Sequence, residues 1–140
     1  MVSSEIREGG NRVGFEVTDV STGRRGVLAH IHQSRGPKVG KYTVNLEDLA
    51  TIGAGAIREA VRTVDIIVID EVGPMELFSR EFREAVEEAV ESGKTVVGTI
   101  HYRARGGLID GLRSNPDAKI IEITLDNREG LPKTIAEMIL

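Results

Sequence analysis

The chain has 140 residues, of which 40% are hydrophobic and 29% are charged, an ordinary composition for one globular domain. Its 18 Lys and Arg residues against 22 Asp and Glu residues give a formal net charge of −4. The chain therefore has no overall positive charge with which to hold nucleic acid or an anionic membrane, and we expect no direct nucleic-acid binding. The absence of Cys excludes disulfides, a thiolate nucleophile and Cys-based metal centres.

Apolar stretches in the sequence are short. The run from Thr95 to Ile100 is far below the roughly 20 residues that a membrane-spanning helix requires. The amino-terminal residues lack the charged start and apolar core of a secretory signal. We therefore expect no membrane partner and a cytoplasmic location.

The first third of the chain has the pattern of short strands. Residues Arg12 to Val20 alternate between apolar and polar and are followed by turn-forming residues, and the segments Gly26 to His32 and Lys41 to Leu46 continue in the same way. This pattern predicts an antiparallel β region over residues 1–46. Asn45 then stands where a helix cap belongs, and apolar residues recur at helical spacing up to Val64.

After Asp65 the pattern alternates between strands and helices. Apolar runs predict strands at Ile66 to Ile69, Thr95 to Ile100 and Lys119 to Thr124, the first of them covered on both faces. The helices between and after them are predicted from a Ser79 cap to Gly93, around Leu108 to Leu112, and from Pro132 onward. Such alternation predicts an α/β fold with a parallel sheet and flanking helices. We expect one domain over residues 1–140, with residues 47–140 carrying the helix and the βα units.

The acidic pair Asp70-Glu71 ends an apolar strand and is the most informative feature of the sequence. In open α/β folds the carboxyl edge of the sheet is where ligands bind. In a P-loop nucleoside triphosphatase, an Asp at this place holds the hydrated Mg²⁺ on the β- and γ-phosphates, and the following Glu polarises the attacking water. Asp70 and Glu71 fit these two roles. The alternative is an acidic pair that only ends a strand.

A phosphate-binding loop of the type Gly-x-x-x-x-Gly-Lys-Ser/Thr would be the natural companion of this pair. The nearest stretch, Gly36 to Thr43, has only three residues between its glycines and has Tyr42 in the Ser/Thr place. The residues after Lys41 alternate as in a strand, whereas a phosphate loop opens a helix whose amino end receives the anion. We therefore reject this stretch as a phosphate loop.

Five segments of the sequence resemble, in order, consecutive blocks of the small nucleoside-triphosphatase family of thermophiles, which has a human cancer-related member. The segments are Glu5 to Phe15, Val39 to Tyr42, Ile69 to Phe78, Gly98 to His101, and Asn127 with Arg128. The resemblance runs from about Ser3 to the carboxyl terminus, and its specific part is Asp-Glu-x-Gly-x-Met-Glu-Leu. It implies a P-loop-type fold of the additional-strand catalytic-glutamate branch. It also implies Mg²⁺-dependent hydrolysis of ATP, GTP and other nucleoside triphosphates to the diphosphate and phosphate.

The same resemblance implies roles for residues outside the acidic pair. Thr99 resembles the polar sensor of the γ-phosphate, although it is equally a β-branched strand residue, and His101 would be a second sensor or proton relay, or else a surface residue. Arg103 would neutralise developing charge, with a solvated loop as the alternative. Asn127 and Arg128 would contact the nucleotide base, unless Asn127 is a helix cap.

The sequence departs from the family at its start, because the family begins with a strand, a Gly-Lys-Thr phosphate loop, its helix and a second strand. The chain therefore resembles an amino-terminally truncated member, and we expect it to be inactive or very weak by itself. The missing strand would lie between Thr95 to Ile100 and Lys119 to Thr124. Without it, either these two strands pair directly, or a sheet edge is left open through which the chain could form a homo-oligomer, and we expect self-association or marginal stability.

Two other functions remain open on the sequence. Without a phosphate loop, the chain could be a non-catalytic nucleotide-sensing or protein-interaction module. A phosphoacceptor receiver domain also has acidic residues at strand ends, but it requires a Lys after the last strand, where this chain has Leu125-Asp126.

Overall fold

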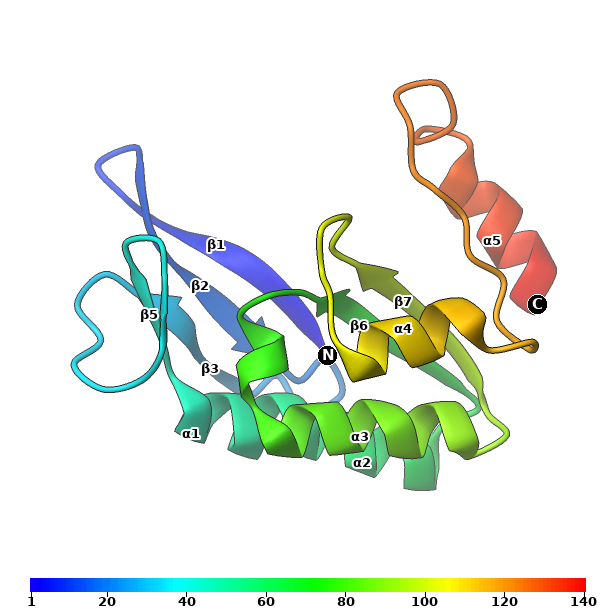
Figure 1. Ribbon diagram of the computed structural model, residues 1–140, viewed down its shortest axis with the longest axis horizontal. Helices are drawn as coiled ribbons and strands as arrows, with labels where there is room; N and C mark the ends of the chain where they lie inside the picture. Colours follow the sequence, from blue (N-terminus) through cyan, green and yellow to red (C-terminus); the bar gives the residue numbers. More distant parts are fainter. The chain divides into compact units, whose positions relative to one another are not determined.

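Seven strands form one sheet in the order β4-β5-β3-β2-β1-β6-β7 (Figure 1). The computed structural model describes all 140 residues, which divide into two compact units, residues 1–105 and 106–140. The whole sheet belongs to the first unit. The prediction of a single domain over the whole chain stays a prediction.

The antiparallel part of the sheet comprises β1 to β5 and confirms the antiparallel region predicted for residues 1–46. Its strands are Val2–Glu8, Asn11–Thr18, Arg25–His30, Lys38–Val39 and Tyr42–Val44. The sequence pattern did not predict β1, because its exposed Ser and Glu residues mask the alternation. This strand joins the two parts of the sheet, since it pairs antiparallel with β2 and parallel with β6 at Val2 and Asp70.

The stretch rejected as a phosphate loop forms a β-hairpin. Strands β4 and β5 pair antiparallel through Lys38 with Thr43 and Val39 with Tyr42. The turn between them contains Gly40, whose φ of +61° favours glycine. Strand β5, and no helix, begins directly after Lys41, so this stretch does not lead into the amino end of a helix, which confirms the prediction.

A continuous helical segment follows the antiparallel strands and covers one face of the sheet (Figure 1). It comprises α1 (Leu46–Asp48), the π-helical stretch η1 (Leu49–Ala54) and α2 (Gly55–Thr63). The predicted cap is confirmed, because the Asn45 side chain accepts a hydrogen bond of 3.0 Å from the backbone N–H of Asp48.

The remaining elements of the first unit are β6 (Ile66–Val72), the short 3₁₀ turn η2 (Glu76–Phe78), α3 (Arg80–Glu91) and β7 (Thr95–Ile100). Strands β6 and β7 are parallel, as predicted. The Ser79 hydroxyl caps α3 by accepting from the N–H of Phe82 at 3.1 Å, and Gly93 follows the helix with a φ of +78°. Both helix boundaries agree with the prediction.

The hydrophobic core lies between the sheet and helices α2 and α3, with Leu28, Leu49, Ile57 and Phe82 among its fully buried side chains. One prediction about β6 is wrong. Its residues Ile67 and Ile69 face the core and are 1% exposed, but Val68 between them is 47% exposed. Successive side chains of a strand point to opposite faces, and α2 and α3 both lie on the same face, so β6 is not covered on both.

Strand β7 stands at the end of the sheet and has one unpaired edge. This agrees with the expectation of an open edge beside Thr95 to Ile100, whereas self-association through it stays a prediction. None of the helices combines the length and the apolar character needed to cross a membrane.

The second unit contains α4 (Gly107–Ser114) and α5 (Leu131–Ile139), which confirm the two predicted helices, with Pro132 in the first turn of α5. The strand predicted over Lys119 to Thr124 is wrong, because these residues are irregular and pair with no strand. The β-branched residues of this segment are suited to a sheet. A strand forms, however, only where a neighbouring strand pairs with its backbone N–H and C=O groups.

Candidate functional site

Asp70 and Glu71 lie near the carboxyl end of β6, in an irregularity of the parallel pairing. The register runs to Ile69 opposite Gly98, shifts, and resumes with Val72 opposite Ile100. The peptide bond between Asp70 and Glu71 is cis, and the N–H of Asp70 donates to the Met1 carbonyl oxygen at 3.1 Å. The strand thus continues for two residues beyond Asp70, which is exposed, whereas Glu71 is partly buried.

Thr99 and Asp70 lie together on adjacent strands. The Thr99 hydroxyl donates a hydrogen bond of 2.7 Å to Oδ1 of Asp70, so the predicted neighbourhood of these two side chains is present. His101 follows at the end of β7, where its backbone N–H donates to the Val72 carbonyl oxygen at 3.1 Å. The exposed His101 ring accepts at Nδ1 from the N–H of Arg103 at 3.2 Å, so the ring is held against its own loop.

Glu76 is a buried carboxyl group that the sequence analysis did not single out as a site residue. It is only 2% exposed, and its Oε2 accepts a hydrogen bond of 3.1 Å from the N–H of Gly73. Burial, chiefly, and then the charges of Glu71 and Asp70 raise the pKa of Glu76 to about 7. The available signal was a Glu between Met75 and Leu77, in an otherwise apolar stretch directly after the acidic pair.

No ion pair of the molecule includes Asp70, Glu71 or Glu76, and the one positive charge that acts on Asp70 is the amino terminus of Met1. No group of three or more His, Asp or Glu side chains is arranged to hold a metal ion. The hard oxygen atoms of Asp70 and Thr99 nevertheless suit Mg²⁺, which usually takes one or two carboxylates from a protein and completes its shell with water and substrate phosphates. The donor set therefore fits a metal that arrives with a nucleotide.

Two arginines border a hollow beside the segment that follows the acidic pair. Arg103 and Arg105 line a space of about 260 Å³ together with Ala104 and with Pro74, Leu77 and Phe78. The predicted residue Arg103 thus lies on the loop after β7, next to the turn that contains Glu76. The hollow combines positive charge with the half-exposed ring of Phe78.

Asn127 and Arg128 belong to the second unit. The Asn127 amide holds its own loop, because Oδ1 accepts from the N–H of Thr124 and Nδ2 donates to the Glu122 carbonyl oxygen, both at 2.8 Å. Arg128 is exposed. A contact of these residues with a nucleotide base stays a prediction.

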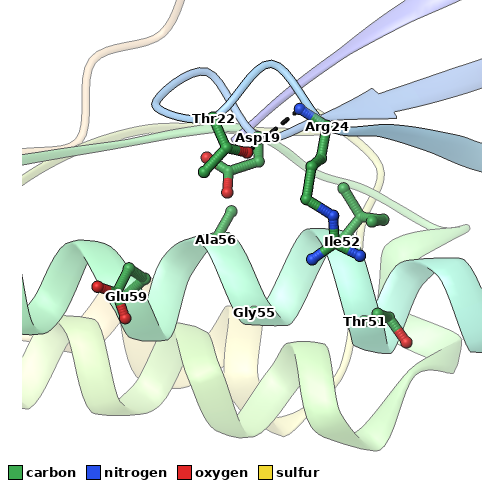
Figure 2. A pocket seen from close by; sticks show the side chains of 8 residues that line it. All are labelled: Asp19, Thr22, Arg24, Thr51, Ile52, Gly55, Ala56 and Glu59. Atoms are coloured by element: carbon green, nitrogen blue, oxygen red, sulfur yellow. Dashed lines mark hydrogen bonds between the residues drawn. The ribbon is translucent and has the colours of Figure 1, made fainter.

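A second hollow, of about 240 Å³, lies between the β2–β3 turn and helix α2, as Figure 2 shows. Asp19, Thr22 and Arg24 border it from the turn, where the N–H of Arg24 donates to the Thr22 hydroxyl at 3.2 Å. None of its lining residues belongs to the predicted site.

Comparison with known proteins gives consistent results. Residues 1–136 match a protein family described as NTPase. The nucleoside-triphosphatase THEP1 of Thermofilum pendens is 48% identical over 99% of this chain and 77% of its own length. The protein of the same name from Methanosarcina acetivorans is 44% identical over 99% of this chain and 77% of its own length. The crystal structure of THEP1 from Aquifex aeolicus has a TM-score of 0.86 and 29% identity, with coverage of 99% of this chain and 81% of that chain.

Proposed function

Because this chain belongs to the NTPase family, we propose that it is a nucleoside-triphosphatase that releases the terminal phosphate of ATP, GTP and similar nucleotides. The observation that carries the proposal is the carboxylate pair near the end of β6, with the Thr99 hydroxyl bonded to Asp70 and no Lys, Arg or His side chain in an ion pair with either acid. Named nucleoside-triphosphatases that are 48% and 44% identical to this chain support it.

In this proposal, Asp70 holds the metal and Thr99 fixes the direction of its carboxylate. The Thr99 hydroxyl occupies one lone pair of Asp70 Oδ1, which leaves the other carboxylate oxygen for a Mg²⁺ ion and its water shell. The ion supplies positive charge for the β- and γ-phosphates.

Glu71 acts on the water in this proposal. Its carboxylate orients the water and accepts a proton as the oxygen attacks the γ-phosphorus, and the bond from that phosphorus to the bridging oxygen breaks to release the diphosphate. Arg103 and Arg105 carry the charge that a terminal phosphate requires as negative charge moves onto the leaving group. Thr99 and His101 lie at the end of β7, where they would contact the γ-phosphate or the water.

Substitution of Glu71 tests this role. Glu71→Gln keeps the size of the side chain but cannot accept the proton, so we expect Mg²⁺-dependent phosphate release to fall by about 10²- to 10⁴-fold while nucleotide affinity stays unchanged. Glu87→Gln, on the exposed face of α3, is the matched control and should leave turnover unaltered. Equal turnover in Glu71→Gln and the unaltered protein would remove Glu71 from this role.

We further propose that the 140-residue chain turns over only weakly by itself. Its sequence has no Gly-x-x-x-x-Gly-Lys-Ser/Thr stretch, so it lacks the backbone cradle and the Lys that position the phosphates. The same observation favours a second candidate, a non-catalytic nucleotide-sensing or interaction module. Phosphate release that requires Mg²⁺ and survives removal of contaminating enzymes would contradict this second function.

A further inference from the structure

Glu76 is a buried acid in the turn that connects the acidic pair with helix α3. It opens the short turn η2, is 2% exposed, and forms no ion pair. A lone carboxyl group in such a place costs stability unless its hydrogen bonds compensate for the lost water. Its Oε2 accepts from the N–H of Gly73 at 3.1 Å, which closes the turn directly after β6.

The same glycine brings Glu76 and Glu71 together. A Cβ atom built on Gly73 would lie 2.9 Å from Oε1 of Glu71 and 3.0 Å from Oε2 of Glu76. Both carboxyl groups therefore lie beside Gly73, with Oε1 of Glu71 and Oε2 of Glu76 less than about 6 Å apart. Only a residue without a side chain leaves space for both of them at this distance.

Two further bonds hold the turn from its other side. The N–H of Leu77 donates to the Gly73 carbonyl oxygen at 3.0 Å, and the Arg83 guanidinium on α3 donates to the Leu77 carbonyl oxygen at 2.5 Å. The turn is thus attached to helix α3. Within the turn, the Glu76 carboxyl group is the side chain that accepts the hydrogen bond from the N–H of Gly73. Because burial keeps the pKa of Glu76 at about 7, the group can serve as an acceptor without adding a full negative charge beside Glu71 at neutral pH.

We propose that Glu76 is a positioning residue, which holds the Gly73 turn closed and thereby aims the Glu71 carboxylate. The proposal rests on the proposed function in one respect, that Glu71 acts on the attacking water. A general base contributes its full effect only at the correct place, and a displacement of about 1 Å can cost about 10²-fold in rate.

The first test compares three variants. Glu76→Gln keeps an acceptor oxygen for Gly73, Glu76→Ala removes it, and Ser79→Ala removes a different buried acceptor of a backbone N–H, at the start of α3. We expect Glu76→Ala to lower kcat by about 10- to 100-fold with KM nearly unchanged. Glu76→Gln should restore most of kcat, and Ser79→Ala should lower Tm but leave kcat at the level of the unaltered protein.

A second readout does not depend on turnover. Hydrogen exchange of the Gly73 amide, measured on the chain without nucleotide, should be slow in the unaltered protein and in Glu76→Gln, and fast in Glu76→Ala. Slow exchange in Glu76→Ala would overturn the proposal, as would a loss of kcat in Glu76→Gln as large as in Glu76→Ala, because Glu76 would then itself transfer the proton. A kcat of Glu76→Ala equal to that of Ser79→Ala would also overturn it.

The two readouts separate this proposal from the proposed function. If Glu71→Gln has the same turnover as the unaltered protein, the proposed function fails, and the exchange of Gly73 still decides whether Glu76 closes the turn. If Glu71→Gln loses turnover and Glu76→Ala does not, the proposed function stands and the positioning role fails.

Discussion

The antiparallel half of the sheet and the carboxyl end of β6 differ in how they accommodate acidic side chains. In the antiparallel half, Glu5 forms ion pairs with Arg7 at 2.8 Å and Arg12 at 3.2 Å. Hydrogen bonds from Arg12 and Arg7 lower the pKa of Glu5. At the end of β6, Asp70 and Glu71 form no ion pair, and their charges help to raise the pKa of a third acid, Glu76.

The distribution of charge along the chain shows the same contrast. Residues 1–46 contain seven basic and four acidic residues, whereas residues 47–140 contain 11 basic and 18 acidic ones. Neighbouring carboxyl groups without cations weaken a fold, and proteins retain such groups mainly at functional sites. The acids of the antiparallel half thus have cationic side chains beside them, whereas those near the end of β6 have none, as the metal-binding role proposed for Asp70 requires.

The same substitution in each region sharpens this comparison. In the antiparallel half, a Cβ atom on Gly14 would lie 2.5 Å from the Ala29 carbonyl oxygen and 2.8 Å from the His30 ring. Because backbone cannot move aside cheaply, we expect Gly14→Ala to lower the free energy of unfolding by about 3 kcal/mol, measured by urea denaturation. Nucleotide turnover at a temperature where the variant stays folded should not change.

Gly73→Ala should affect turnover more than stability, in contrast to Gly14→Ala. Its Cβ atom would meet the flexible carboxyl ends of Glu71 and Glu76, which can rotate away, so we expect a loss of less than about 1 kcal/mol in unfolding free energy. The displaced carboxylates should lower kcat by about 10-fold or more. If Gly73→Ala loses stability and keeps its kcat, the division between the two regions is wrong.

The pH dependence of stability offers a second way to break the comparison. The pKa of Glu76 is about 7 in the folded protein, against an ordinary value of 4.5. Between these pH values the folded state holds the proton that the unfolded chain has released, so the contribution of Glu76 to the free energy of unfolding is greatest below about pH 4.5 and falls as the pH rises to about 7. The expected fall between pH 5 and pH 7 is about 2 kcal/mol.

Glu76→Gln provides the control for this measurement, because it keeps the buried acceptor and cannot titrate. Urea unfolding at pH 5 and pH 7 should show the fall in the unaltered protein and not in the variant. The other shifted carboxyl groups, Glu5, Asp19 and Glu84, have a lowered pKa and lose their stabilising effect only at lower pH. If the free energy of unfolding of the two proteins changes in the same way with pH, the burial of Glu76 does not weaken the fold.

The sequence predicts much of the fold because the signals concerned are local. Asn45 and Ser79 cap their helices as expected, since a cap depends only on the few residues that follow it. Strand β6 and its acidic pair are also visible in the sequence. The strand expected at Lys119 to Thr124 fails because strand formation depends on a partner, which no local pattern reveals.

The candidate site is only partly visible in the sequence for a related reason. The pairing of Thr99 with Asp70 follows from the parallel register of two neighbouring apolar strands, so it can be predicted. The burial of Glu76 and its approach to Glu71 over Gly73 depend on how a six-residue turn folds back, and periodicity carries no information about that path. Sequence patterns therefore locate the acids but do not separate the exposed ones from the buried one.

The smallest expected effect concerns the ion pairs of the antiparallel half. Glu5 is 41% exposed, and its partners Arg7 and Arg12 are 55% and 44% exposed, so solvent already screens these charges. We expect Glu5→Gln to leave Tm unchanged within error at low and high salt. Tyr42→Phe is a useful contrast, because it removes the partly buried hydroxyl that accepts from Nε of Arg12 at 3.0 Å and should cost about 1 kcal/mol. A larger drop in Tm for Glu5→Gln than for Tyr42→Phe would mean that charge pairing itself, and not the packing around Tyr42, stabilises this half of the sheet.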